Sequence, residues 1–416
     1  MNKTYICIDL KTFFASVECV LRGLDPFETN LVVADPDRQT GTLCLAISPK
    51  MKAQGIKNRC RIYEIPKEIK YIMAKPRMSK YIEYSSQIYS IYLRFISSSD
   101  IHVYSIDEVF IDATNYLALY KLDAISLAKK LINEVYKETG ITAAAGIGTN
   151  MYLTKIALDI TAKHTKDNIG YLNQQLFLKE LSNHVPLTDF WGIGKGISER
   201  LKKYGIYDME GIRNIDPKKL YKEFGINAEI LIDHSNGIEP CTIEDIKIYK
   251  PKNNSTSIGQ VLHKDYNFID AKTILKEMID LLSLDLIDKE LLAGKIGITI
   301  GYKRGTIGST GCSYSLENST NSYKDLEEKF MYIYNKTTDT DIPIRKITVY
   351  ASSFTKIGIE QLDLFHESNH LEMKLEKTMN DLKKKFGKNS ILRGISYTES
   401  GTARERNKQI GGHNAE

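Results

Sequence analysis

The sequence predicts an α+β fold built from several domains, and three observations support this. The chain has 416 residues, which at roughly 100–200 residues per domain indicates about two to four domains. Hydrophobic residues make up 42% of it and charged residues 26%, close to globular averages, which excludes extensive disorder. Predicted strands and helices alternate in the N-terminal part, but the strands are too many for a simple β-α-β repeat. This excess favours α+β over a doubly wound sheet.

The N-terminal part is predicted to form a sheet with helices packed on it. An apolar strand at 5–9 is followed by a helix in which Phe13 and Val17 recur at helical spacing. Ser48 is a good N-cap and Pro49 a favoured first helical residue, so a short helix is expected there. The other elements predicted in this part are strands at 31–34, 43–47, 101–106, 109–113 and 141–148, and helices at 79–96, 124–138 and 150–163.

The rest of the chain is predicted to contain a helical region, a second mixed region and a tail. Residues 171–237 read as wholly helical, and the polar stretch 247–257, with proline and paired asparagines, reads as a linker. Residues 258–357 alternate again. Beyond Gly358 a lysine-rich tail is expected to be flexible and to end in disorder. The elements predicted in the second mixed region are strands at 296–303 and 347–354 and helices at 270–290 and 322–335.

Charge and cysteine usage exclude some classes of protein. The net charge is +5, and the last 43 residues carry ten basic and five acidic side chains, so the remainder is neutral. Net charge therefore does not indicate a nucleic-acid partner. No window reaches the roughly 20 apolar residues of a membrane span, and early charged residues argue against a signal peptide. Six cysteines without a Cys-x-x-Cys spacing fit a reducing cytoplasm better than a zinc ribbon or a disulfide framework.

Three carboxylates lie where predicted strands end. Asp9 ends the first strand, and Asp107 and Glu108 join two later ones. Neighbouring side chains at the tip of a hairpin can lean toward one point, and Asp9 on an adjacent strand would add a third oxygen donor. Such donors suit Mg²⁺, and two Mg²⁺ ions can promote an in-line phosphoryl transfer. The alternative is that Asp107 and Glu108 are solvated turn residues and Asp9 caps its strand.

Several sequence blocks carry a family resemblance. The stretches IDLKTFFAS at 8–16 and YSIDEVFID at 104–112 contain the carboxylates, GIGTNMYLTKIA follows at 146–157, and FWGIGKGISERL occupies 190–201. In this order they resemble the two metal motifs, the third palm block and the thumb of the Y-family translesion DNA polymerases. The resemblance is to the UmuC-like branch and its Gram-positive UvrX-type relatives, and it extends from Tyr5 to about residue 365.

The resemblance implies a right-hand polymerase architecture with a palm, small fingers, a helical thumb with a helix-hairpin-helix motif, an α/β little finger and a flexible C-terminal tail. The implied ranges are 1–30 and 75–170 for the palm, 31–74 for the fingers, 171–240 for the thumb, 246–357 for the little finger and 358–416 for the tail.

The resemblance also implies the catalytic and metal-binding residues. Asp9, Asp107 and Glu108 would hold two Mg²⁺ ions per active site, with Leu10 contributing its backbone carbonyl. No side chain need act as nucleophile, because the primer 3′ hydroxyl attacks the incoming dNTP.

Two lysines match nucleotide-contacting positions of the family. Lys155 would touch the incoming triphosphate, the alternative being a solvated helix lysine, and Lys52 matches a basic position of the fingers. The sequence departs from much of the family at Pro49, where many members carry Tyr. Proline has neither a hydroxyl nor an N–H, so the resemblance leaves the triphosphate contact at this position open.

Two adjacent phenylalanines fall at the position of the incoming sugar. Phe14, directly before Ala15, resembles the family's steric gate, which would exclude a 2′ hydroxyl and select deoxynucleotides. Phe13 lies beside the same nucleotide-binding position but is expected to belong to the helix core. The alternative places both rings in the core.

A glycine pair resembles the hairpin of a helix-hairpin-helix motif. Gly192 and Gly194 permit a tight turn, and free backbone amides at the following helix start, with Lys195, would bind a DNA phosphate. By itself a Gly-x-Gly sequence is usually only a turn.

The segment from Gln361 to Phe365 resembles the short peptide by which bacterial polymerases bind the sliding clamp. A glutamine is followed by spaced apolar anchors, Leu362, Leu364 and Phe365. The alternative is that these side chains cover the little-finger core.

The resemblance thus implies a cytoplasmic enzyme of the SOS response: a monomeric DNA-directed DNA polymerase that extends primer–template DNA past damaged bases with low fidelity. One competitor is a catalytically inactive DNA-binding repair scaffold. Another is a zinc metalloprotease, since His366 and His370 fit a His-Glu-x-x-His pattern, although no third ligand is evident.

Overall fold

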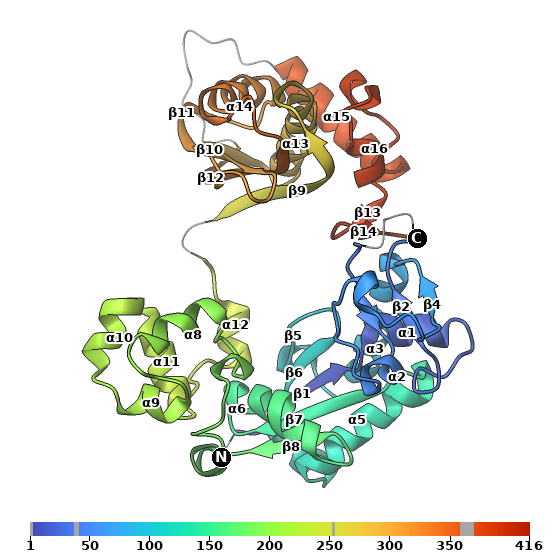
Figure 1. The fold of residues 1–416 in the computed structure, drawn as a ribbon, viewed down its shortest axis with the longest axis vertical. Helices are drawn as coiled ribbons and strands as arrows, with labels where there is room; N and C mark the ends of the chain where they lie inside the picture. The colour runs from blue at the N-terminus through green and yellow to red at the C-terminus, as the bar shows by residue number, and fades with distance from the viewer. Residues whose placement is uncertain (1–2, 37–40, 252–253, 358–369) are drawn as a thin grey trace. The chain divides into compact units, whose positions relative to one another are not determined.

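The computed structural model describes residues 3–36, 41–251, 254–357 and 370–416. The chain divides into two compact units (Figure 1). The first comprises Met1–Tyr249 together with Asn414–Glu416, and the second comprises Lys250–His413. The α+β class predicted from the sequence is confirmed.

The first unit is built on a five-stranded sheet with the order β5-β6-β1-β7-β8. The central strand β1 pairs antiparallel with both β6 and β7, whereas β7 and β8 run parallel. The strands are β1 (Tyr5–Leu10), β5 (Ile101–Val103), β6 (Glu108–Asp112), β7 (Ala143–Gly148) and β8 (Ile169–Leu172).

The two faces of this sheet pack against different elements because side chains alternate along each strand. Ile6 and Ile8 of β1 join the main core of the unit, while Cys7 joins a smaller cluster on the opposite face with Met151 of α6. The alternation places Asp9 on the face of Cys7. The helices of this part are α1 (Phe13–Val20), α3 (Met78–Leu93), α4 (Thr114–Tyr120), α5 (Ala124–Thr139) and α6 (Met151–Ile156), which continues into a π-helical turn (Ala157–Thr161) and a 3₁₀ turn (Ala162–His164).

A glycine in β7 lets α6 approach the sheet closely. A Cβ atom on Gly146 would lie 2.1 Å from the carbonyl oxygen of Thr154, so only glycine fits at this distance. This close approach places Lys155, the residue after Thr154, against the sheet.

A three-stranded sheet with the order β3-β2-β4 forms a small subdomain with its own apolar cluster. Ser48 caps α2 as expected, since its Oγ accepts a hydrogen bond from the backbone N–H of Met51. The elements of this subdomain are β2 (Leu31–Val33), β3 (Ala46–Ile47), β4 (Ile72–Ala74), α2 (Pro49–Ala53) and a 3₁₀ turn (Ile62–Glu64). A further 3₁₀ turn, Ser98–Asp100, precedes β5 of the main sheet.

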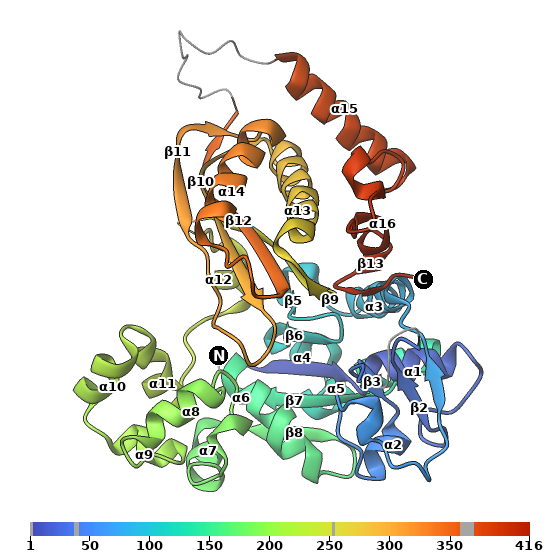
Figure 2. The same cartoon turned by 45° about the horizontal axis from the view of Figure 1, so that its top comes forward.

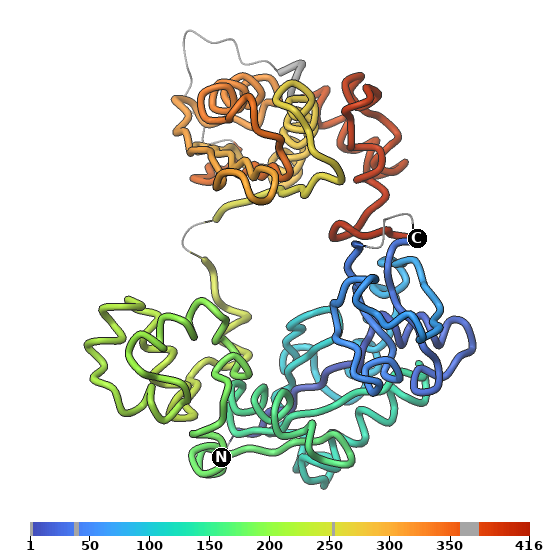
Figure 3. The backbone as a smooth tube through the Cα atoms, in the orientation of Figure 1, coloured from blue at the N-terminus to red at the C-terminus, as the bar shows by residue number. Residues whose placement is uncertain are grey.

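The region after β8 is helical (Figure 3). Its apolar side chains form a cluster that also includes side chains of α6 and β8. The prediction that residues 171–237 are wholly helical is wrong at its start, because Tyr171 and Leu172 belong to β8 and pair with β7. The elements are α7 (Gln174–Glu180), a 3₁₀ turn (Leu187–Asp189), α8 (Lys195–Lys202), α9 (Met209–Asn214), α10 (Pro217–Phe224), α11 (Asn227–Ser235) and α12 (Ile243–Ile248).

The second unit contains a four-stranded antiparallel sheet with the order β11-β10-β12-β9. Helices α13 and α14 cover one face of it (Figure 2), and their apolar side chains form the core with those of the strands. The elements are β9 (Ser255–Tyr266), α13 (Phe268–Asp288), β10 (Leu291–Tyr302), β11 (Ser313–Thr320), α14 (Tyr323–Thr337) and β12 (Ile344–Lys356).

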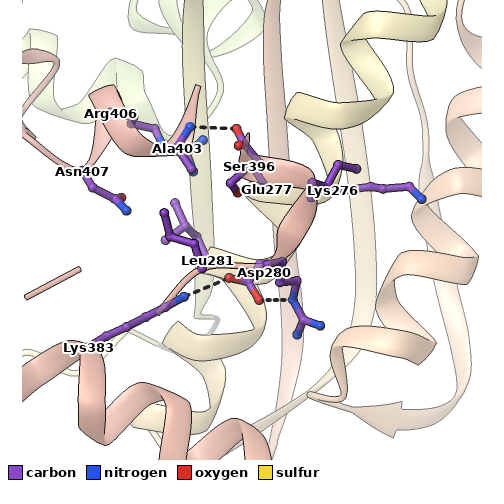
Figure 4. Close-up of a pocket in the computed structure, with 12 residues that line it drawn as sticks. Lys276, Glu277, Asp280, Leu281, Lys383, Ser396, Ala403, Arg406 and Asn407 are labelled. Atoms are coloured by element: carbon purple, nitrogen blue, oxygen red, sulfur yellow. Dashed lines mark hydrogen bonds and ion pairs between the residues drawn. The ribbon is translucent and has the colours of Figure 1, made fainter. Parts of the chain in front are cut away.

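The expectation of a flexible, disordered tail is wrong for residues 370–416. Asp280 of α13 accepts hydrogen bonds from Lys383 Nζ at 3.1 Å and Arg393 Nε at 2.5 Å (Figure 4), so buried ion pairs fix the lysine-rich segment to α13. The expected clamp-binding segment and His366 lie outside the described residues. The C-terminal elements are α15 (His370–Phe386), a 3₁₀ turn (Gly394–Tyr397), α16 (Ala403–Arg406), β13 (Gln409–Ile410) and β14 (His413–Asn414).

Candidate active site

The pairing of β1 with β6 places two of the expected carboxylates opposite each other. Asp9 and Glu108 are direct partners in the antiparallel register. The backbone N–H of Leu10 donates to the carbonyl oxygen of Asp107 at 2.9 Å, which extends the pairing by one residue. The structure therefore brings Asp9, Asp107 and Glu108 to one edge of the sheet, as the sequence predicts.

A tight turn holds Asp107 at this edge. The backbone N–H of Tyr104 donates to the carbonyl oxygen of Glu108 at 3.0 Å, and Ser105 Oγ donates to Asp107 Oδ1 at 2.7 Å. From outside the turn, Ser85 of α3 donates to the carbonyl oxygen of Ile106 at 2.6 Å. Asp107 remains half-exposed, so its carboxylate is open to a ligand.

Glu108 is buried and ion-paired. Lys155 Nζ lies 2.9 Å from its carboxylate and 3.1 Å from Asp159 Oδ1. Burial lowers the pKa of Lys155, but the Glu108 carboxylate outweighs it, and the net pKa is raised. Cys7 Sγ donates to Glu108 Oε1 at 3.1 Å, and burial followed by the Glu108 charge raises the pKa of this thiol. Lys155 is therefore a buried cation of the site and not a solvated helix lysine.

Asp9 lies in a crowded anionic environment. Burial, and then the charges of Asp107 and Glu108, raise the pKa of Asp9 to about 7. In the part of the chain that the structure describes, no three His, Cys, Asp or Glu side chains are arranged closely enough to hold a metal ion. The donor chemistry nevertheless fits a hard divalent cation, because the three side chains offer only carboxylate oxygens and a cation would relieve their mutual repulsion.

The two phenylalanines differ in environment. Phe13 is 2% exposed and belongs to the core, as expected. Phe14 is half-buried and stacks on Tyr81, with ring centroids 4.6 Å apart and planes 21° apart. Its gate role stays a prediction.

The expected nucleotide-contacting lysine of the small subdomain is exposed. Lys52 lies on α2, whose first residue is Pro49. The structure does not bring Lys52 into hydrogen-bonding or ion-pairing contact with the carboxylates, so its role also stays a prediction.

The turn at Gly192–Gly194 leaves room for a DNA backbone to approach its main chain closely. Gly192 has φ 87°, and the backbone N–H of Ile193 donates to the carbonyl oxygen of Phe190 at 3.1 Å, which closes the turn. A Cβ atom added to Gly192 or Gly194 would meet open space. Lys195 begins α8 directly after this turn and is exposed.

Two site residues were not foreseen in the sequence. Cys7 lies two residues before Asp9 in the same strand, so strand alternation alone places both side chains on one face. Asp159 lies four residues after Lys155, the spacing at which helical side chains meet.

The comparisons with known proteins agree with this geometry. Residues 8–159 match the impB/mucB/samB family, and residues 253–364 match the C-terminal domain of that family. UvrX of Bacillus subtilis (strain 168) is 32% identical to the chain over 99% of the chain and 98% of UvrX. The chain belongs to the impB/mucB/samB family. DNA polymerase IV 2 of the same organism is 30% identical, over 99% of each chain.

A solved structure has the same fold. A Y-family DNA polymerase chimera of Dbh and Dpo4 superposes with a TM-score of 0.66 at 21% identity, covering 85% of this chain and 99% of the chimera. The fold that the motif resemblance predicts is thereby confirmed: the chain has the fold of a Y-family DNA polymerase and is similar to UvrX. In the described residues, no helix is long and apolar enough to cross a membrane.

Proposed function

We propose that this Y-family protein is an error-prone DNA-directed DNA polymerase that performs translesion synthesis in DNA damage tolerance, with Asp9, Asp107 and Glu108 as its catalytic carboxylates. The observation that carries the site assignment is the register of β1 and β6, which sets Asp9 opposite Glu108 with Asp107 beside them. The relatives named DNA polymerase IV and the Y-family fold support the activity.

Each residue of the site has a defined part in this reaction. Asp9, Asp107, Glu108 and the carbonyl of Leu10 would hold divalent cations, proposed to be two Mg²⁺ ions, which supply charge stabilisation for in-line transfer of a nucleotide to the primer 3′ hydroxyl. Lys155, freed from Glu108 when cations neutralise the carboxylates, would contact the triphosphate. Phe14, and Phe13 behind it, would shape the sugar pocket.

We assign the remaining regions by the same family pattern. The palm would comprise residues 1–30 and 75–170, the fingers 31–74, the thumb 171–240 and the little finger 246–357. Gly192, Gly194 and Lys195 would contact a DNA phosphate, Lys52 would face the nucleotide, and the 361–365 segment would bind the sliding clamp. We further propose that the enzyme acts as a monomer in the cytoplasm.

The site is tested by primer extension with Asp107→Ala and Glu108→Ala. Both variants should lose extension while DNA binding persists, because charge stabilisation is removed where the transition state requires it. Asp112→Asn is the matched control: it removes a carboxylate from the same strand, where Asp112 pairs with Lys3 at 2.6 Å, and should extend primers normally. Near-normal extension by Asp107→Ala would refute the site. An inactive wild type that still binds DNA would instead indicate a repair scaffold.

A further inference from the structure

The chain's single tryptophan joins the glycine hairpin to the turn that carries the catalytic carboxylates. Trp191 directly precedes Gly192 in the hairpin turn. Its indole Nε1 donates a hydrogen bond to the hydroxyl of Tyr104 at 3.0 Å. Tyr104 in turn begins the turn that leads to Asp107. The contact thus bridges 87 residues of sequence between the two segments.

Ring packing fixes the geometry of this contact. The rings of Trp191 and Tyr104 meet edge to face, with centroids 5.9 Å apart and planes at 83°. Trp191 also lies 6.0 Å from Phe110, which is 1% exposed and stands two residues after Glu108 on the same face of β6. A shift of Trp191 would therefore move or unpack side chains of residues 104–110, the segment that carries both carboxylates.

The other side of the indole reaches the helix that carries Lys155. Trp191 is stacked near His234 at 6.4 Å, and His234 stacks on Tyr152 at 3.9 Å. Tyr152 is fully buried on α6, three residues before Lys155. Trp191 is thus connected to α6, which supplies the cationic partner of Glu108, through the ring of His234.

We propose that Trp191 and Tyr104 are positioning residues that connect the glycine hairpin to the Asp107–Glu108 turn. When a DNA phosphate binds the hairpin, this contact would hold the turn in the position that binds cations. The proposal rests on the proposed function, in which the hairpin contacts DNA and the turn binds cations. Because coupling between two sites is reciprocal, cation binding at the turn should also alter the surroundings of Trp191.

The first arm of the test is kinetic. Tyr104→Phe and Trp191→Phe each remove one partner of the hydrogen bond while keeping an aromatic ring. Each should slow single-turnover nucleotide incorporation on preformed enzyme–DNA complexes by roughly fivefold, the equivalent of one neutral hydrogen bond. The melting temperature, and the affinity for DNA measured in EDTA, should stay unchanged, and the double variant should be no slower than either single variant.

Tyr116→Phe is the matched control. Its hydroxyl donates to Asp100 at 2.6 Å in the same unit but away from the site, and its loss should leave incorporation unchanged. Wild-type rates in Tyr104→Phe and Trp191→Phe, or losses that add in the double variant, would overturn the coupling.

The second arm does not depend on catalysis. Because Trp191 is the sole tryptophan, tryptophan fluorescence reports on the surroundings of this one side chain, which include Tyr104. Adding Mg²⁺ to a complex with a dideoxy-terminated primer should change the emission of the wild type but not of Tyr104→Phe or Asp107→Ala. An unchanged wild-type emission would overturn the proposal. If the wild type fails to extend primers yet its emission responds, the proposed function fails while the link between hairpin and turn survives.

Discussion

Charge balance at Glu108 depends on a single lysine. The Glu108 carboxylate is buried beside Asp9, and Lys155, 8% exposed, is the cation that faces it. Removing one partner of a buried ion pair leaves an uncompensated charge, which typically costs about 3–5 kcal/mol. A divalent cation bound by the carboxylates would also neutralise the negative charge of Glu108. The lysine and the cation would therefore compete for Glu108.

Lys155→Met is expected to lower the melting temperature in EDTA and to recover part of the loss in millimolar Mg²⁺. Ligand binding to the folded state stabilises it, and the gain should exceed that of the wild type because the competing lysine is gone. Thermal unfolding with and without Mg²⁺ measures both effects. Lys163→Met, at an exposed lysine nearby, should behave as the wild type does. A loss that Mg²⁺ does not reduce would contradict the competition.

Phe14→Ala is expected to admit ribonucleotides. Truncating this half-buried ring opens space beside the 2′ carbon, and sugar discrimination should fall by roughly 10- to 100-fold, the range for a steric difference of this size. Primer extension with dNTP and rNTP gives the ratio.

Phe13→Ala serves as the comparison for Phe14. Its ring is 2% exposed, so truncation should cost about 3–5 kcal/mol of stability. The remaining folded protein should keep its sugar selectivity. Unchanged selectivity in Phe14→Ala would show that this ring is a core residue instead of a gate.

At the scale of whole elements, the sequence predicts best those segments whose own residues form the core. The strand expected at 5–9 is β1, and the helix expected at 124–138 is α5. β11 was missed because it is a mostly polar edge strand in which only Tyr314 and Leu316 alternate as apolar residues. β8 was missed because its parallel pairing with β7 depends on distant residues.

In the site too, contacts between residues close in sequence are easier to predict than contacts between residues far apart in sequence. The neighbouring positions of Asp107 and Glu108 are predictable because a hairpin is a local feature, whereas Asp9 joins them through the long-range pairing of β1 with β6. The ion pair of Glu108 with Lys155 is not predictable, because the docking of α6 on the sheet decides it.

The C-terminal segment shows how a tertiary partner reverses a prediction. A lysine-rich composition favours disorder in isolation. Glu277 on α13 accepts hydrogen bonds from Thr402 and from the backbone N–H of Ala403 at 2.9 Å, while Asp280 pairs with Lys383 and Arg393. Acidic residues of α13, about 100 positions earlier, thus supply the charges that order this segment.

Asp280→Ala is expected to release the segment from α13. The buried Lys383 would lose its ion-pair partner and the partly buried Arg393 one of its two, at a cost of about 3–5 kcal/mol. Urea unfolding of the full chain gives the loss, and limited proteolysis should show new cleavage between α15 and α16. Asp288→Ala is the control: Asp288 pairs with Lys384 at the exposed surface of the same helix, and its loss should cost about 0–1 kcal/mol. Equal stability of the two variants would show that the Asp280 ion pairs do not hold the segment.

At the scale of the whole molecule, the family match includes both units. The two matched ranges, 8–159 and 253–364, fall one in each unit. The second range includes all of the expected clamp-binding segment except Phe365, and the segment lies in sequence between β12 and α15. A partner bound there would be attached to the second unit and would leave the carboxylate site of the first unit chemically unchanged.

The clamp-binding segment is expected to set how much DNA the enzyme extends, not how it catalyses. Leu362, Leu364 and Phe365 are apolar anchors that can fill a preformed pocket, and Gln361 can fix the register by hydrogen bonds. Ordering the segment costs free energy, so the contact should be weak. A weak contact suffices, because a clamp that encircles the DNA raises the local concentration of the polymerase.

Leu364→Ala combined with Phe365→Ala should therefore leave clamp-free extension and the melting temperature unchanged but abolish stimulation by the sliding clamp. Extension of a primed circular template, with and without the loaded clamp, measures the effect. Glu360→Ala, one residue before the segment, is the matched control and should keep full stimulation. If the double variant loses stability, the two side chains serve the core of the second unit. If it is stable and the clamp still stimulates it fully, the clamp binds elsewhere on the chain.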